Sequence, residues 1–319
     1  MSSPGPMAAT HPAGHKNHGL MHLLMLFVTI CWASNIIAGK EALRRFDSLA
    51  LAQLRVLGSA IIFTIAFLAT GRFRCLRLSR RDWGFLLAIG ATGIALNQLT
   101  FIGGMARTSV AHTGLIVALG PVLVLVIAVL IGLESLTASK LLGMLVAFSG
   151  VGILTLDKAG QGRGGHWLGD LLMLASITVF AVYTILMKEV ANKFDPLTLN
   201  TLAFGLGGIM MLPFCSRAVA MTNWASIDSS AWEGLAFLVV FGSVISYSLF
   251  AYVMTELAAS RVAAFNYLQP VIASALGIWV LAERLTPKVL VGGALILAGV
   301  YLTERERGEE SVPAAATDA

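Results

Sequence analysis

Long apolar runs separated by short polar segments dominate the pattern of this chain. Each run approaches the ~20 apolar residues that a helix needs to cross the hydrocarbon of a bilayer, and the runs lack the alternation of a membrane β-barrel. The pattern predicts an all-α polytopic membrane protein with ten transmembrane helices. The expected spans are 20–38, 48–70, 83–104, 108–133, 138–156, 167–187, 196–215, 232–254, 259–282 and 285–303. The remaining ends, 1–19 and 304–319, are predicted to be disordered tails.

The composition supports a membrane protein. The sequence is 57% hydrophobic and 12% charged, with a mean hydropathy of +0.82. Counted with glycine and without tyrosine, roughly 66% of the residues are apolar, against about 45–50% in soluble domains. The net charge of +5 is spread over the loops and forms no dense basic stripe. The expected partners are therefore the lipid bilayer and a small-molecule substrate, not nucleic acid.

The chain contains two copies of one unit. Residues 32–54 align with 180–202 at a constant offset of 148, and 120–137 align with 269–286 at an offset of 149. We expect two five-helix repeats, at 20–157 and 167–303, joined by a linker at 158–166. Because five is odd, the copies must lie in opposite orientations, as in secondary transporters with inverted repeats. Such carriers bind their substrate between the repeats, near the midplane.

Each unit carries the same set of motifs. An aromatic residue, Trp32 or Phe180, lies in its first helix, and a proline in its fourth helix precedes a glutamate, "LT" and a glycine-bearing fifth helix. This doubled set resembles the drug/metabolite transporter superfamily, specifically ten-helix carriers with two EamA-type domains, over about 20–303. The resemblance implies an inner-membrane carrier, commonly an exporter of amino acids, other small metabolites or drugs.

Polar and aromatic side chains gather in the first, third, fourth, sixth, eighth and ninth spans, which we expect to line a cavity. Interhelical hydrogen bonding is the alternative role for each polar residue. Amides and aromatics with no deep carboxylate favour small amphiphilic solutes, neutral or zwitterionic, including aromatic amino acids. The candidate substrate-binding residues are Trp32, Asn35, Asn97, Phe101, Tyr183, Tyr247, Tyr252, Asn266 and Tyr267.

Two prolines and two ionisable residues are further candidates. A proline inside a helix removes one hydrogen bond and bends the helix, so Pro121 and Pro270 are predicted kinks that serve gating or packing. Arg55, eight residues into the second span, either extends to the interface or acts as a coupling or structural charge. His112 either titrates or packs at the interface.

Other classes of protein and site fit less well. The sequence has no metalloprotease, nucleophile-elbow or phosphate-loop motif, so we expect no enzyme activity. The spacing of its three cysteines indicates neither a metal site nor a disulfide framework, and no cofactor is expected. A channel for small solutes is the alternative function, but it requires a continuous polar lining or a ring of like charges.

The distribution of basic residues favours cytoplasmic termini. Five arginines lie between the second and third spans, within 72–81, and cytoplasmic loops are enriched in Lys and Arg. The expected location is the cell inner membrane. Gly143 and Gly150, like Gly292 and Gly299, are seven residues apart and share a helix face. They predict close helix contact, either within one chain or between the subunits of a homodimer.

Overall fold

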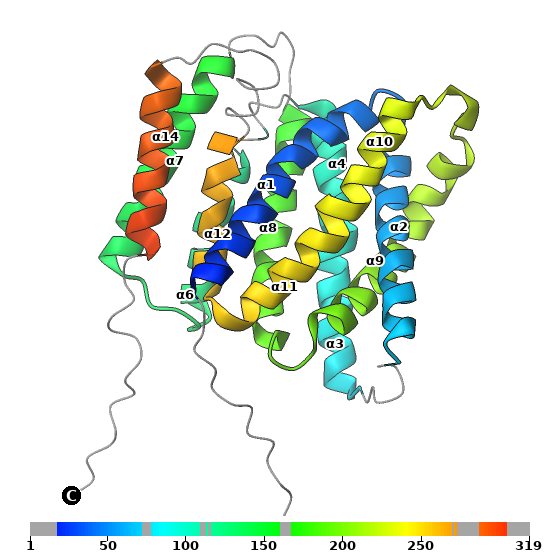
Figure 1. Cartoon of the computed structure of the whole chain (residues 1–319), viewed down its shortest axis with the longest axis horizontal. Coiled ribbons are helices and arrows are strands. Elements are labelled where there is room, and N and C mark those ends of the chain that lie inside the picture. Colours follow the sequence, from blue (N-terminus) through cyan, green and yellow to red (C-terminus); the bar gives the residue numbers. More distant parts are fainter. Residues whose placement is uncertain are drawn as a thin grey trace, which may run out of the picture.

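The computed structural model describes residues 18–71, 78–108, 113, 116–159, 167–269, 271–272 and 287–304. These residues form helices and contain no strand (Figure 1). The α-helices are α1 (His18–Ala42), α2 (Ser48–Ala69), α3 (Arg80–Ile89), α4 (Asn97–Arg107), α6 (Gly120–Leu130), α7 (Ala138–Ala159), α8 (Trp167–Val190), α9 (Pro196–Ala220), α10 (Ser229–Val239), α11 (Ser246–Glu256), α12 (Ala259–Ala264) and α14 (Pro287–Glu304). Two π-helical segments, η2 (Gly90–Leu96) and η4 (Val240–Ile245), and two 3₁₀ turns, η3 (Trp224–Ser226) and η5 (Phe265–Tyr267), complete the set.

Six described stretches are long and apolar enough to cross a membrane, which makes the chain a polytopic membrane protein. They are Gly19–Ala42, Ser48–Ala69, Arg80–Arg107, Trp167–Val190, Pro196–Ala220 and Ser229–Glu256. Shorter apolar helices cover Gly120–Leu130, Ala138–Ile153 and Leu290–Thr303. The predicted fourth and ninth spans are represented by the short helices α6 and α12.

The third and eighth spans share an interruption that the sequence pattern did not predict. α3, η2 and α4 form one continuous helix of 28 residues, and α10, η4 and α11 form another of the same length. Each therefore has a π-helical segment in its middle. A π segment closes its hydrogen bonds over five residues instead of four, which shifts the faces of the helix that follow it, and it is frequent at functional sites.

A glycine in each π segment lets a side chain of another helix lie close to the backbone. A Cβ on Gly93 in η2 would lie 2.1 Å from the ring of Tyr183, and a Cβ on Gly242 in η4 would lie 2.1 Å from Oδ1 of Asn35. Gly93 and Gly242 are 149 positions apart, and Asn35 and Tyr183 are 148 apart. The two halves thus make the same contact, in which a side chain of the first helix fills the space beside a glycine.

Two lysines hold the ends of these long helices. Lys40, near the end of α1, donates to the carbonyl of Thr108 at 2.9 Å, directly after α4. Lys188, near the end of α8, donates to the carbonyl of Leu257 at 2.8 Å, directly after α11. Each ammonium also donates to the carbonyl three residues earlier. The carbonyls at a helix end have no partner within the helix, and cations near them are favourable.

Two ion pairs join the halves and fix their relative direction. Arg45, just after α1, pairs with Asp228 at the start of α10, and Lys193, just after α8, pairs with Asp82 at the start of α3. The hydrogen bond of Lys40 to Thr108 places the end of α1 beside the end of α4, whereas the pair Lys193–Asp82 places the end of α8 beside the start of α3. Because α3 to α4 is one helix about 42 Å long, α1 and α8 run in opposite directions.

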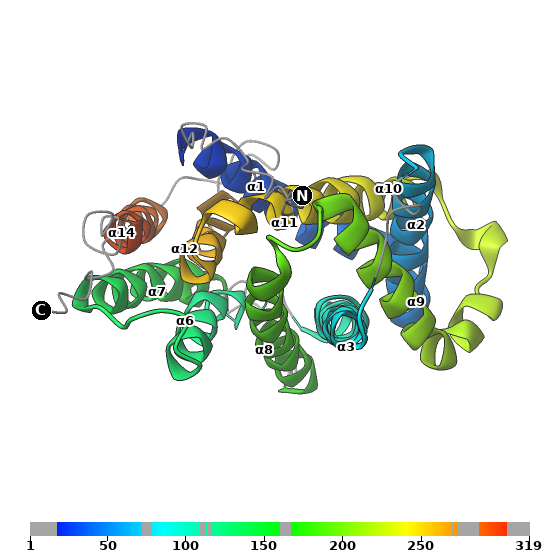
Figure 2. The same cartoon turned by 90° about the horizontal axis from the view of Figure 1, so that it is seen from below.

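Equivalent helices also pack on each other at the two ends of the molecule. Figure 2 shows α7 with α14 at one end and α2 with α9 at the other, and both pairs are in contact. A Cβ on Gly150 would lie 2.6 Å from the carbonyl oxygen of Gly292, and one on Gly299 would lie 2.5 Å from that of Gly143. These glycines therefore serve a close contact within the chain.

The glutamate of the repeated phrase has a structural role in the first half. Glu134 accepts a hydrogen bond from the backbone N–H of Ser260 at 3.0 Å and another from the Ser260 hydroxyl. It also pairs with Lys140 at 3.3 Å, and both side chains are buried. Glu134 thereby ties the end of α6 to the starts of α7 and α12. Its counterpart Glu283 lies outside the described residues.

Candidate functional site

A cavity lies between the two halves. Its volume is about 90 Å³, whereas a single water needs roughly 10–15 Å³, so the cavity holds several waters or a small solute. The lining residues are Trp32, Asn35, Arg55, Asn97, Gln98, Phe101, Val117, Gly120, Val124, Ser176, Ile177, Phe180, Ala181, Thr184, Tyr247, Phe250, Ala263, Asn266 and Gln269. They come from all six spans in which polar residues gather, and Arg55 adds the second span.

Most of the candidate residues come together at this cavity. The structure places seven of them in its lining, namely Trp32, Asn35, Arg55, Asn97, Phe101, Tyr247 and Asn266. They lie on α1, α2, α4, α11 and η5, so residues more than 200 positions apart in the sequence share one surface. The arrangement combines an aromatic surface, several amides and one guanidinium group.

The aromatic side of the cavity is centred on Trp32. Its ring centroid lies 5.6 Å from that of Phe180 and 5.4 Å from that of Phe250, and it lies 6.1 Å from the ring of Tyr247. Aromatic pairs favour such tilted and edge-on arrangements. The sequence analysis did not select Phe180 or Phe250 for the site. The repeat alignment contained a signal for Phe180, because it is the counterpart of Trp32.

The amides supply both donors and unused acceptors. Nε2 of Gln98 donates to the hydroxyl of Tyr247 at 3.3 Å, and these two residues are counterparts in the repeat, 149 positions apart. Nδ2 of Asn97 donates to the hydroxyl of Ser176 at 3.0 Å. Oδ1 of Asn35 and Oε1 of Gln98 are buried and accept no hydrogen bond from any described residue. A buried acceptor without a partner is costly, by about 1–3 kcal/mol, so a bound solute or water would stabilise both.

Arg55 brings a positive charge into this site. It is only 3% exposed. Its Nε donates to the hydroxyl of Ser243 at 2.9 Å, and its Nη2 donates to the carbonyl of Gly242 at 3.0 Å. Both acceptors belong to η4 and both are neutral. Among the described residues, no carboxylate pairs with Arg55.

Three candidate tyrosines do not line the cavity. Tyr183 and Tyr267 are fully buried, and their hydroxyl groups have no hydrogen-bond partner among the described residues. The ring of Tyr183 instead fills the space beside Gly93. Tyr252 is 43% exposed, on the outer surface of α11.

The prolines and His112 differ in how much the structure describes. Pro121 does not lie inside a continuous helix, because Ala118 and Leu119 form a turn and α6 begins at Gly120. It sits in the first turn of α6, where the missing N–H removes no intrahelical bond. The predicted kink is thus a break in the span, beside the cavity. Pro270 and His112 lie outside the described residues.

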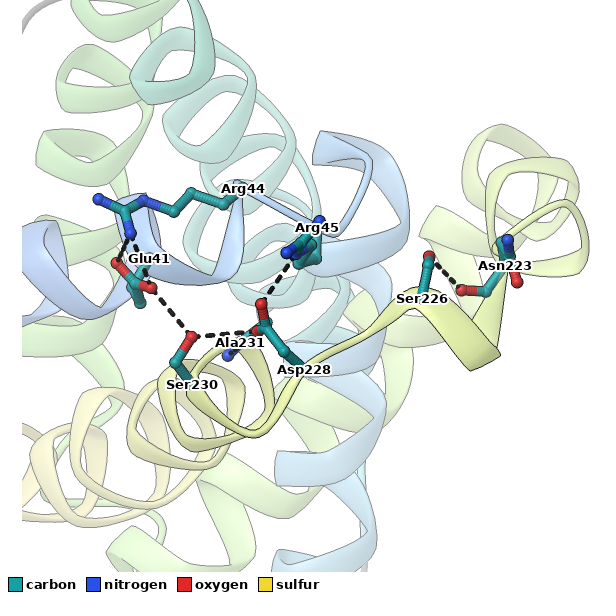
Figure 3. A network of polar contacts seen from close by, with 8 residues as sticks. All are labelled: Glu41, Arg44, Arg45, Asn223, Ser226, Asp228, Ser230 and Ala231. Atoms are coloured by element: carbon teal, nitrogen blue, oxygen red, sulfur yellow. Dashed lines mark hydrogen bonds and ion pairs between the residues drawn. The ribbon is translucent and has the colours of Figure 1, made fainter.

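The ion pair between Arg45 and Asp228 belongs to a larger network of polar contacts (Figure 3). Nε of Arg45 donates to Asp228 at 2.8 Å, and Asp228 also accepts from Ser230 and from the backbone N–H of Ala231, each at 3.0 Å. The hydroxyl of Ser230 also contacts Glu41 at 3.0 Å. The hydrogen bond from Arg45 is the main reason that the pKa of Asp228 lies below its ordinary value. The carboxylate therefore stays charged at neutral pH.

Opposed helical halves around a central cavity define the fold of a membrane transporter. The sequence pattern of the EamA-like transporter family matches residues 19–156 and, a second time, residues 167–305. The chain belongs to this family, which is part of the drug/metabolite transporter superfamily.

Relatives along the whole chain are named as transporters. An "Uncharacterized transporter" of Archaeoglobus fulgidus is 26% identical over 89% of this chain and 98% of its own length. A "Probable terminal-alkyne amino-acid exporter" of Streptantibioticus cattleyicolor is 27% identical over 91% of this chain and 96% of its own. A protein of known crystal structure has the same fold, with a TM-score of 0.72 over 90% of this chain and 96% of that chain, at 17% identity.

Proposed function

We propose that this protein is a secondary transporter of the cell inner membrane that exports small amphiphilic metabolites, such as amino acids, or drugs. In this proposal ten helices cross the membrane as two inverted five-helix repeats, with both termini in the cytoplasm. The cavity between the halves binds the substrate, and the halves rearrange to open it to one side at a time. No chemical conversion of the substrate is involved.

The equivalence of the two halves is the observation that carries this proposal. Lys40 and Lys188 donate to equivalent carbonyls, each directly after the long helix of its own half, and the helices that carry these lysines run in opposite directions. The pairs Arg45–Asp228 and Lys193–Asp82 join the halves at the two opposite ends of these long helices. Two inverted copies can exchange conformations, which gives two states of similar energy. We assign each ion pair to closure of the cavity on its own side of the membrane.

The lining supports the substrate class. Trp32, Phe180 and Phe250 offer an apolar surface, while Gln98 offers an amide oxygen that no described residue uses. Such a lining binds the apolar body and the polar head of one solute. The relative named as a probable amino-acid exporter is consistent with amino acids as substrates.

Counterflow in proteoliposomes tests this function. Purified protein is reconstituted, the vesicles are loaded with one amino acid of a panel, and uptake of the same radiolabelled amino acid is followed. A carrier gives saturable uptake that is accelerated by unlabelled substrate on the opposite side. Conductance that does not saturate would instead support a channel, and transport restricted to strongly anionic sugar nucleotides would contradict the proposed substrate class.

A further inference from the structure

The charge of the cavity is concentrated on one residue. Arg55 is the one charged side chain in the described lining, and every other described lining residue is neutral. Placing an unpaired charge within a membrane protein is costly, and such residues commonly mark substrate pathways. A charge that is retained beside a solute cavity calls for a ligand of the opposite sign.

The guanidinium has donors left for such a ligand. It carries five N–H groups in a planar fork, and the described residues accept from two of its atoms, Nε and Nη2. These two bonds anchor the group to Ser243 and Gly242, so its position is fixed before a solute arrives. Arginine forks bind carboxylates with two parallel hydrogen bonds, which is the geometry that lysine does not offer.

The rest of the lining matches the other parts of an amino acid. Gln98 lines the cavity and its Oε1 accepts no hydrogen bond from any described residue, whereas Oδ1 of Asn35 lies against Gly242. An ammonium group has three donors and can offer one of them to Oε1 of Gln98. The rings around Trp32 provide a surface for an apolar side chain and also attract a cation over their faces.

We propose that Arg55 is the receptor for a carboxylate of the transported solute, which makes the substrates zwitterionic amphiphiles of the α-amino-acid class. This inference rests on the proposed function and specifies its substrate. The carboxylate pairs with Arg55, the ammonium group faces Oε1 of Gln98, and the side chain lies against the aromatic cluster. Amines without a carboxylate are then poor substrates.

A purely structural role for Arg55 makes a different prediction. The bonds to Ser243 and Gly242 hold the π segment η4, so loss of the guanidinium would weaken the whole fold. Such damage lowers the transport of every solute by the same factor. A carboxylate receptor instead affects solutes according to whether they carry a carboxylate. The ratio between two matched solutes therefore separates the two roles.

The experiment compares L-phenylalanine with L-phenylalaninamide, which differs only in the replacement of the carboxylate by a neutral amide. Binding to purified protein is measured by isothermal titration calorimetry, and counterflow is measured in proteoliposomes. For the wild-type protein we expect phenylalanine to bind at least 10-fold more tightly than the amide, as typical for loss of one charge-assisted pair. Arg55→Gln should abolish this preference by weakening phenylalanine alone. Arg55→Lys should retain part of it.

Thr201→Val is the control, because it removes a buried hydroxyl that bonds the carbonyls of Phe63 and Leu197 outside the cavity lining and leaves Arg55 and its anchors unchanged. It should leave the preference for phenylalanine intact, even where it lowers stability. If Arg55→Gln is not recovered as a folded protein, the ratio of the phenylalanine and phenylalaninamide affinities of the wild-type protein still tests the proposal. Equal binding of the acid and the amide, or no binding of phenylalanine, overturns the role of Arg55. Saturable transport confined to amines without a carboxylate also overturns the role of Arg55, but it agrees with the carrier function. Binding of phenylalanine without saturable transport contradicts the carrier function alone.

Discussion

The two halves of this protein share their framework but differ in the charge that they bring to the cavity. The first half has Lys40 at the end of its long helix and Gly93 in its π segment, and the second half has Lys188 and Gly242 at the corresponding places. At the position of Arg55, however, the second half has Ala203, which packs against Gly90. The contacts of the framework are thus duplicated, and the group assigned to selectivity occurs once.

This difference separates two requirements of a carrier. Exchange between two states of similar energy needs equivalent contacts in both halves. Recognition of an asymmetric solute needs an asymmetric wall, because the carboxylate and the side chain of an amino acid differ. Mutations of the duplicated contacts should therefore have matched effects in the two halves, and mutations of Arg55 should have no counterpart.

The largest effects are expected at the two π glycines. Gly93→Ala and Gly242→Ala each place a Cβ about where an atom of Tyr183 or Asn35 lies, so packing must change. Each should lower the free energy of unfolding by about 1–3 kcal/mol, and transport should fall with it. Thermal unfolding in detergent measures the loss. Gly205→Ala is the control, because a Cβ there meets open space, and it should not destabilise.

The lysines at the helix ends should come next. Lys40→Met and Lys188→Met keep the aliphatic stem but lose the hydrogen bonds to the carbonyls after α4 and α11. A hydrogen bond to a charged group contributes about 1.5 kcal/mol at the lower end of its range, which applies here because both ammonium groups are only partly buried. Both variants should therefore unfold at lower temperature, by similar amounts. Arg44→Met is the control, because the side chain of Arg44 is 73% exposed. It should change the free energy of unfolding by no more than about 0.5 kcal/mol. A strong effect of only one lysine would break the equivalence of the halves.

The ion pairs between the halves should matter less for stability. Arg45 and Asp228 are both about half exposed, and exposed pairs contribute about 0–1 kcal/mol, so Arg45→Ala should leave the unfolding temperature almost unchanged. Lys193 is half exposed but its partner Asp82 is buried, so Lys193→Ala should lower the unfolding temperature somewhat more, because it leaves a buried carboxylate without its cation. Because the two states of a carrier are close in energy, each change should still alter the counterflow rate a few-fold. The exchange Arg45→Asp with Asp228→Arg should restore the rate in part, because arginine at position 228 cannot accept from the backbone N–H of Ala231.

The smallest effect is the pH dependence of the pair on one side. The pKa of Asp228 is lowered, chiefly by its bond to Arg45. A carboxyl with a lowered folded-state pKa stabilises the protein above its unfolded pKa of about 3.9, and this contribution is lost as the pH falls through the folded value. Between about pH 5 and 8 the difference in counterflow rate between wild-type protein and Arg45→Ala should stay constant. A change within that range would show that another group controls the pair.

The sequence predicted the repeat and the helices of the cavity more closely than the individual side chains. Periodicity and composition locate long apolar helices well, because crossing a bilayer imposes their length. No local pattern predicts the π segments η2 and η4, whose glycines Gly93 and Gly242 contact Tyr183 and Asn35 from distant parts of the sequence.

The tyrosines of α11 lie on different faces of their helix. Tyr247 and Tyr252 are five residues apart, which places them about 140° apart around an α-helix. Tyr247 lines the cavity, whereas Tyr252 is 43% exposed. Tyr183 lies outside the cavity lining for a different reason, because its ring occupies the gap beside Gly93.

Accessibility of one cavity position from each side of the membrane tests alternating access most directly. Thr184 lines the cavity, and Thr184→Cys is made in a protein whose native Cys31, Cys75 and Cys215 are replaced by alanine. An impermeant thiol reagent is applied to intact cells and to inverted vesicles. We predict that Arg45→Ala increases labelling from one side and decreases it from the other, and that Lys193→Ala does the reverse. Increased labelling from both sides in each variant would contradict alternating access and indicate a pore.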